Sequence, residues 1–180
     1  MLEREIKLEF PSLEAARVAV RALGLPVLHE RRLQDDTLYD LPDTPLRTRG
    51  CALRLRRDDG TGIVTFKGPV EPGPMKVRPE VETTVGDDAK MQAILEALGF
   101  APVFRYQKYR EEFGDARCVV TIDDTPVGVF VELEGEAERI AALADALGFG
   151  PEAYVTLSYF RLHQQRASAL GLGAHMLFPA

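Results

Sequence analysis

The chain has 180 residues, of which 46% are hydrophobic and 28% charged, the composition of an ordinary globular protein. Its 22 basic and 28 acidic residues give a net charge of −6, which argues against broad binding to nucleic acid or to an anionic membrane. No stretch is long and apolar enough to span a bilayer, and charged residues follow Met1 where a secretory signal would be apolar. We therefore expect a cytoplasmic protein with a single domain over residues 1–180, either a monomer or a homodimer.

The first predicted element is a strand over residues 2–10, in which the charged residues Glu3, Glu5 and Lys7 alternate with mostly apolar ones. Because successive side chains of a strand point to opposite faces, this strand has one charged and one largely apolar face. Further runs show the same alternation, and short turn signals between several of them favour antiparallel pairing. These runs cover residues 27–40, 51–58, 62–68, 76–85, 102–113, 117–123 and 127–134.

Three segments with helical periodicity lie between these strands. Each ends at a glycine, Gly24, Gly99 or Gly148, where a helix commonly closes with a left-handed residue. The pattern predicts three amphipathic helices. We expect them to begin after Ser12, at Asp87 or Asp88, and near Gly135 or Glu136.

The charged faces of the strands carry like charges two residues apart, such as Arg54 with Arg56 and Glu132 with Glu134. A solvated outer face explains any one strand, but like charges repeated along a face repel unless something binds between them. Closing the strands into a barrel, with helices over the apolar outer face, turns the charged face into a lumen. The predicted fold is therefore α+β: a closed eight-stranded antiparallel β-barrel with helices packed on the outside.

This lumen would hold six cations and seven anions. Arginine and lysine side chains match phosphate oxygens, whereas clustered carboxylates match Mg²⁺ or Mn²⁺. A polyphosphate that carries a divalent metal would use both kinds of group. The cations are Lys7, Arg54, Arg56, Lys67, Lys108 and Arg110, and the anions are Glu3, Glu5, Glu80, Glu82, Asp123, Glu132 and Glu134.

The same residues form an ordered set of short motifs. They are EREIK at 3–7, LRLR at 53–56, TFKGP at 65–69, EVE at 80–82, KYR at 108–110, TIDD at 121–124 and VFVELEGE at 129–136. In this order the motifs resemble those of the CYTH proteins, also called triphosphate tunnel metalloenzymes. The resemblance implies a barrel whose lumen binds a triphosphate together with a divalent metal.

The resemblance also implies a role for each charged residue. The phosphate-binding residues would be Lys7, Arg54, Arg56, Lys67, Lys108 and Arg110. The chief metal ligands would be Glu132, Glu134 and Asp123, with Glu3 and Glu5 able to hold a second metal or to orient the attacking water. Glu3, Glu5 and Lys7 are thus the candidate catalytic residues, and Glu80 and Glu82 would support basic side chains or a metal-bound water.

Three functions remain open at this point. We favour hydrolysis of inorganic triphosphate or of an organic triphosphate such as thiamine triphosphate. The alternative is a class IV adenylyl cyclase, which would convert ATP to cyclic AMP and pyrophosphate; its His-Phe signature before the ExExK motif is absent here, since only Met1 and Leu2 precede Glu3. A further alternative is a protein that binds polyphosphate or nucleotide without turning it over.

Overall fold

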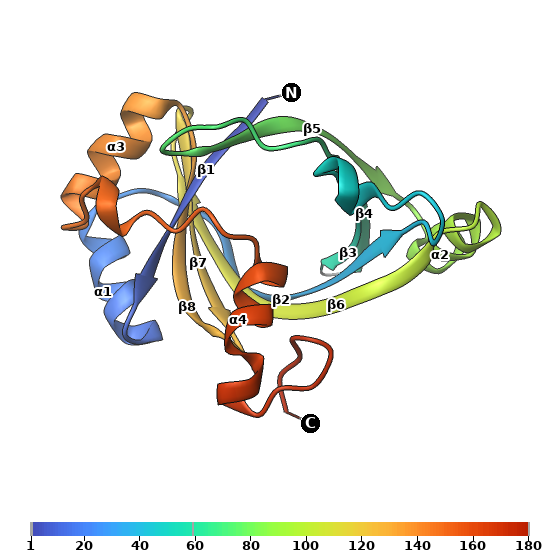
Figure 1. The fold of residues 1–180 in the computed structure, drawn as a ribbon. Coiled ribbons are helices and arrows are strands. Elements are labelled where there is room, and N and C mark those ends of the chain that lie inside the picture. Colours follow the sequence, from blue (N-terminus) through green and yellow to red (C-terminus); the bar gives the residue numbers. More distant parts are fainter. Residues whose placement is uncertain (1, 59, 180) are drawn as a thin grey trace.

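The computed structural model describes residues 2–58 and 60–179; Met1, Asp59 and Ala180 lie outside the described residues. Eight strands in this part of the chain form a closed barrel in the order β1-β5-β4-β3-β2-β6-β7-β8, and neighbouring strands run antiparallel (Figure 1). The predicted fold class is therefore confirmed. The strands are β1 (Leu2–Phe10), β2 (Val27–Asp40), β3 (Ala52–Asp58), β4 (Thr61–Lys67), β5 (Lys76–Val85), β6 (Ala101–Gly114), β7 (Cys118–Thr125) and β8 (Gly128–Gly135).

The three predicted helices are present, and the structure adds a fourth. Helices α1 (Leu13–Ala22), α2 (Asp88–Ala97) and α3 (Ala137–Ala146) are each followed by a glycine with positive φ, as the sequence predicts. Helix α4 (Tyr159–Leu170) was missed because polar residues 164–166 interrupt its apolar pattern, although Ser158 and Gly171 cap its two ends. Two short 3₁₀ helices, η1 (Leu46–Arg49) and η2 (Pro151–Ala153), complete the set. Within the described ranges no helix has the length and apolar content needed to cross a membrane.

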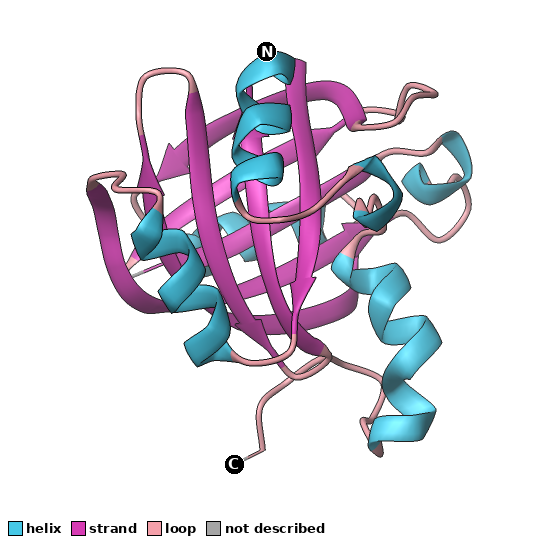
Figure 2. Cartoon of the chain, turned by 90° about the vertical axis from the view of Figure 1, so that its left-hand side faces the viewer, coloured by secondary structure: helices cyan, strands magenta, loops and turns pink. Residues whose placement is uncertain are grey.

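The main hydrophobic core lies outside the barrel wall. In the β1–β8 pair, Ile6 faces Leu133 and Leu8 faces Val131, and all four side chains are fully buried. Helices α1 and α3 cover this apolar face with side chains that include Val20, Ile140 and Leu143. Figure 2 shows helices lying on the outside of the strands. Because the apolar residues of each strand point outward to the helices, the alternate charged residues line the lumen.

Apolar side chains from α4 and the C-terminal segment fill one end of this lumen. Phe104 lies on the same face of β6 as Lys108 and Arg110, and Phe130 on the same face of β8 as Glu132 and Glu134. Both belong to one apolar cluster with Tyr159 of α4. Met176 is fully buried in the same cluster, and its N–H donates to the Arg105 carbonyl at 3.1 Å. The apolar C-terminal segment is thus part of the barrel, and the charged part of the lumen opens at the other end.

The tight β7–β8 pairing depends on Gly135. A Cβ at Gly135 would lie 2.2 Å from the Arg117 carbonyl oxygen, whereas a Cβ at Gly24, which also has positive φ, would meet nothing within 4 Å. We expect Gly24→Ala to cost about 1 kcal/mol from its left-handed backbone alone, and Gly135→Ala to cost clearly more because the backbone itself must move. Urea unfolding of both variants measures the difference. Equal losses would mean that the β7–β8 pair can shift without penalty.

Candidate functional site

A buried network of ion pairs occupies the middle of the lumen. The Asp123 carboxylate is fully buried and accepts hydrogen bonds from Lys108 Nζ at 2.9 Å and from Arg110 Nε at 2.6 Å. Glu132 pairs with Arg110 and with Lys7, whose Nζ lies 3.1 Å from Glu132 Oε1. Burial alone would lower the pKa of Lys7, but the negative charges of Glu132 and Glu5 outweigh it and raise that pKa. These five predicted site residues therefore form one network.

Arg54 and Arg56 line the opposite wall around a carboxylate that the sequence analysis did not select. Asp36 of β2 is fully buried and accepts a hydrogen bond from Arg56 Nε at 2.8 Å. Arg54 Nη2 donates to Thr65 Oγ1 at 2.9 Å and to Glu82 Oε2 at 3.2 Å. Arg54 Nε is buried without a hydrogen-bond partner, although Asp36 Oδ1 lies 3.6 Å away. Arg54 Nε on this wall is therefore a positively charged donor that has no acceptor among the described residues.

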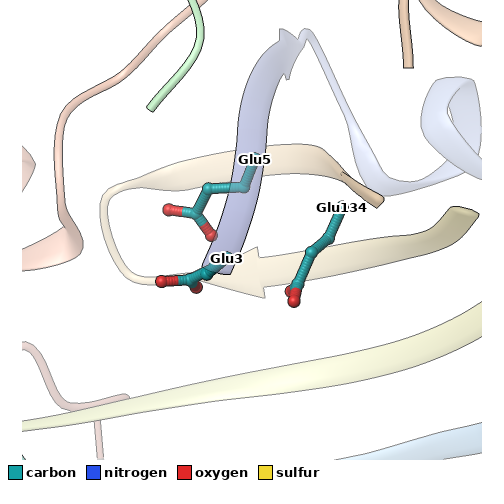
Figure 3. Close-up of side chains that lie close together, drawn as sticks. All are labelled: Glu3, Glu5 and Glu134. Carbon is teal, nitrogen blue, oxygen red and sulfur yellow. The ribbon is translucent and has the colours of Figure 1, made fainter. Parts of the chain in front are cut away.

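Three carboxylates gather at the open end of the lumen. Glu3 and Glu5 of β1 and Glu134 of β8 each place an oxygen within 4.8 Å of the others (Figure 3). A cavity of about 410 Å³ adjoins them, lined by Glu3, Glu80, Val81, Glu82 and Glu134. Lys67 reaches the same region, since its Nζ lies 2.5 Å from Glu3 Oε1 and it also pairs with Glu80. The lining of this cavity is thus acidic, and cations lie behind its carboxylates.

The electrostatics of this cluster favour a bound cation. Loss of hydration, followed by the negative charges of Glu3 and Glu5, raises the pKa of Glu134 to about 7. Because the Glu134 side chain is exposed at the mouth, solvent screens part of this effect. Three carboxylate oxygens at this spacing are the hard ligands that Mg²⁺ and Mn²⁺ take, so the donor set fits a divalent cation.

The structure separates the predicted metal ligands into two environments. Glu3, Glu5 and Glu134 lie together at the mouth, where Lys67 and Arg78 pair with Glu3 and Lys76 pairs with Glu5. Glu132 and Asp123 lie deeper and are held by the cations of the central network. Their assignment as metal ligands stays a prediction.

Several charged residues of the lumen were missed by the sequence analysis. Lys76 pairs with Glu5, and Arg78 Nε donates to Glu3 Oε2 at 3.1 Å. The signal for both was available, since they lie two residues apart on the same face of β5 as Glu80 and Glu82. Asp36 had no such signal, because it follows another aspartate, Asp35, and alternation alone does not say which of the two points inward.

Comparison with known proteins agrees with this fold. A family model described as the CYTH domain matches residues 1–148. The chain belongs to the CYTH family. A protein of Methanocaldococcus jannaschii, named as a candidate adenylate cyclase, is 30% identical over 173 residues, covering 90% of this chain and 98% of its own. The matched CYTH region ends before α4, so this helix and Tyr159 lie beyond it.

Solved structures of similar proteins share the CYTH barrel. A candidate adenylate cyclase from Vibrio parahaemolyticus superposes with a TM-score of 0.80 at 23% identity, covering 91% of this chain and 98% of its own. A protein from Hippeastrum, described as a candidate adenylyl cyclase with a dominant triphosphatase activity, superposes with a TM-score of 0.68 at 20% identity, covering 91% of this chain and 95% of its own. At these identities the likeness concerns the fold.

The two adjacent aspartates of this CYTH chain allow a matched test of the buried network. We expect Asp36→Asn to destabilise the fold by about 3–5 kcal/mol at neutral pH, because it leaves Arg56 and Arg54 buried without their carboxylate. Asp35→Asn removes a partner of Arg105 outside the lumen, where Arg105 is largely exposed, and should cost at most about 1 kcal/mol. Urea unfolding of the two variants measures both losses.

The effect of Asp36 should also depend on pH. Burial opposes its ionisation, but Arg56 and Arg54 outweigh burial and lower the pKa of Asp36. Its stabilising contribution is therefore present at neutral pH and is lost as the pH falls through the pKa of the folded state. A loss for Asp36→Asn no larger than that for Asp35→Asn at pH 7 would contradict this account.

Proposed function

We propose that the protein is a divalent-metal-dependent triphosphatase that hydrolyses inorganic triphosphate, or an organic triphosphate such as thiamine triphosphate, in the lumen of its barrel. The observation that carries the proposal is the union of two sites in one lumen: buried cations with an unfilled donor, and three carboxylates at the mouth. We expect it to act in the cytoplasm on a small molecule, with neither nucleic acid nor membrane as a partner.

The phosphate-binding part of the proposal rests on the donors that the ion pairs leave free. Arg54 Nε is buried and has no hydrogen-bond partner. Arg56 uses Nε and Nη2 on Asp36, so its Nη1 can bind a phosphate oxygen. Lys108 and Arg110 share Asp123 on the facing wall, and Arg110 also pairs with Glu132. An ammonium has three N–H groups and a guanidinium five, so both side chains keep N–H groups beyond these pairs. Together with Lys7 and Lys67, these side chains would neutralise the charge of a triphosphate.

The carboxylate part of the proposal concerns Mg²⁺ or Mn²⁺. Glu3, Glu5 and Glu134 are the ligands that the geometry favours, because their oxygens already lie within 4.8 Å of one another. Glu3 and Glu5 would exchange or share their lysine and arginine partners with the metal. Glu132 and Asp123 would have to do the same, but their oxygens do not gather with those of a third carboxylate among the described residues. A bound divalent ion would offset charge on the phosphate oxygens and lower the pKa of a bound water.

Hydrolysis requires little covalent chemistry from the protein. Water attacks the terminal phosphorus in line with the bridging oxygen; one P–O bond forms and one breaks, giving orthophosphate and a diphosphate product. The lumen cations fix the phosphate chain and offset its charge, which is the main requirement of phosphoryl transfer. Glu80 and Glu82 would support this arrangement, since Glu80 pairs with Lys67 and Glu82 accepts from Arg54.

A class IV adenylyl cyclase is the second candidate, favoured by the name of the Methanocaldococcus jannaschii relative. Cyclisation would use the same lumen, but the ribose 3′-hydroxyl would take the place of water and attack the α-phosphate. A binder without turnover is the third candidate. It gains little from so many carboxylates beside an anionic guest, which is why we rank it last.

Product analysis separates the three candidates. The protein is incubated with Mg²⁺ or Mn²⁺ and with tripolyphosphate, thiamine triphosphate or ATP. We expect orthophosphate, and we expect the double variant Glu132→Gln, Glu134→Gln to lose nearly all of it. Glu9→Gln is the matched control, because Glu9 lies at the end of β1 and pairs with Arg166 at the surface. Pyrophosphate with cyclic AMP would establish the cyclase, and no product at all would leave the binder.

Metal binding should depend on pH through Glu134. With a pKa of about 7, this carboxyl must lose a proton before it can bind a cation. The affinity for Mn²⁺ alone should therefore rise about tenfold from pH 6 to pH 8, a range centred on that pKa. Calorimetric titration without substrate measures it, and Glu134→Gln should bind more weakly and lose most of the pH dependence. An equal pH dependence in that variant would show that another group releases the proton.

A further inference from the structure

Tyr159 enters the charged lumen from outside the region that matches the CYTH domain. It is the first residue of α4, and its side chain is almost fully buried. Its hydroxyl donates a hydrogen bond to Asp123 Oδ2 at 2.7 Å. A phenol hydroxyl buried at the inner end of an apolar cluster is thus directed at the central ion network.

This hydrogen bond completes the shell of donors around Asp123. Lys108 Nζ and Arg110 Nη2 also donate to Oδ2, at 2.9 and 2.5 Å, and Arg110 Nε donates to Oδ1 at 2.6 Å. With the Tyr159 hydroxyl the carboxylate accepts four hydrogen bonds, which matches its usual capacity. Each donor therefore restricts where the carboxylate can turn, and the carboxylate in turn fixes Lys108 and Arg110.

The ring of Tyr159 also makes cation–π contacts with two lysines of the network, Lys7 and Lys108. Lys7 Nζ lies 5.3 Å and Lys108 Nζ 5.1 Å from the ring centroid, within the range of cation–π attraction. The ring is itself held by Phe130, at 5.8 Å between centroids, and by the neighbouring Leu162 of α4 in the apolar cluster. The positions of the Lys7 and Lys108 ammonium groups therefore depend on how α4 packs against the barrel.

We propose that Tyr159 is a positioning residue for the triphosphate, acting through Asp123, Lys108 and Lys7. This inference rests on the proposed function. Without the hydroxyl, Asp123 is free to turn and to take a further N–H from Lys108 or Arg110. Rotation of Asp123 and its acceptance of a further N–H would each withdraw a donor from the phosphate, so both would weaken triphosphate binding. Helix α4 thereby serves as a wall of the site as well as a cover for the end of the barrel.

The test measures binding of tripolyphosphate alone, by calorimetry without added metal, so that no metal ligand enters the result. Tyr159→Phe keeps the ring and removes the hydroxyl; we expect the Kd to rise about threefold to tenfold, the loss of one hydrogen bond. Tyr159→Leu removes the ring as well and should raise it further. Tyr109→Phe is the matched control, because Tyr109 lies on the other face of β6 against Phe178, and it should leave the Kd unchanged.

A second control separates positioning from packing. Leu162→Ala weakens the same apolar cluster without touching the ion network, so it should lower the unfolding midpoint and leave the Kd of the folded protein unchanged. A Kd for Tyr159→Phe within twofold of the wild type would overturn this inference but not the proposed function. An equal rise of the Kd in Leu162→Ala would do the same. Wild-type protein that binds tripolyphosphate neither alone nor with Mg²⁺ would overturn both this inference and the proposed function.

Discussion

The structure depends on one constraint: a charge placed inside the barrel loses its hydration and must find a partner there. The like charges that repeat along single strands therefore find partners across strands. Arg54 and Arg56 both approach Asp36 from a neighbouring strand, and Glu3 is met by Lys67 and Arg78. Because the antiparallel register brings these side chains together, closing the barrel also pairs the charges in its lumen.

The side chains on neighbouring strands also determine the ion pairing and the pKa of each motif residue. Glu132 and Glu134 stand two positions apart in one strand and point the same way. Lys7, Arg110 and Lys108 surround Glu132 and, against the effect of burial, hold its pKa well below the usual range. Loss of hydration and the nearby carboxylates of Glu3 and Glu5 instead raise the pKa of Glu134. The first carboxylate is thereby tied into the central ion network, and the second has no cationic partner of this kind in the described part of the chain.

The period-2 alternation of the sequence was enough to predict the strands, the outer core and most of the lumen, because inward and outward residues are chemically distinct. It failed where that distinction is lost. Asp35 and Asp36 are chemically identical neighbours, and only the pairing of β2 with β3 turns the second toward Arg56. Tyr159 could not be found in this way, since its partner Asp123 lies 36 positions earlier and the helix that carries it has an interrupted apolar pattern.

The apolar cluster that fills one end of the lumen makes the barrel a socket with a single opening. From Phe130 to Glu134, four residues of strand span roughly 13 Å. Four carboxylates line the cavity at the mouth, and they would repel a phosphate that protrudes beyond a bound metal. A longer polyphosphate would have to leave its extra units in that acidic ring. Under the proposed function, the depth of the lumen would therefore limit the length of the phosphate chain that the protein accepts.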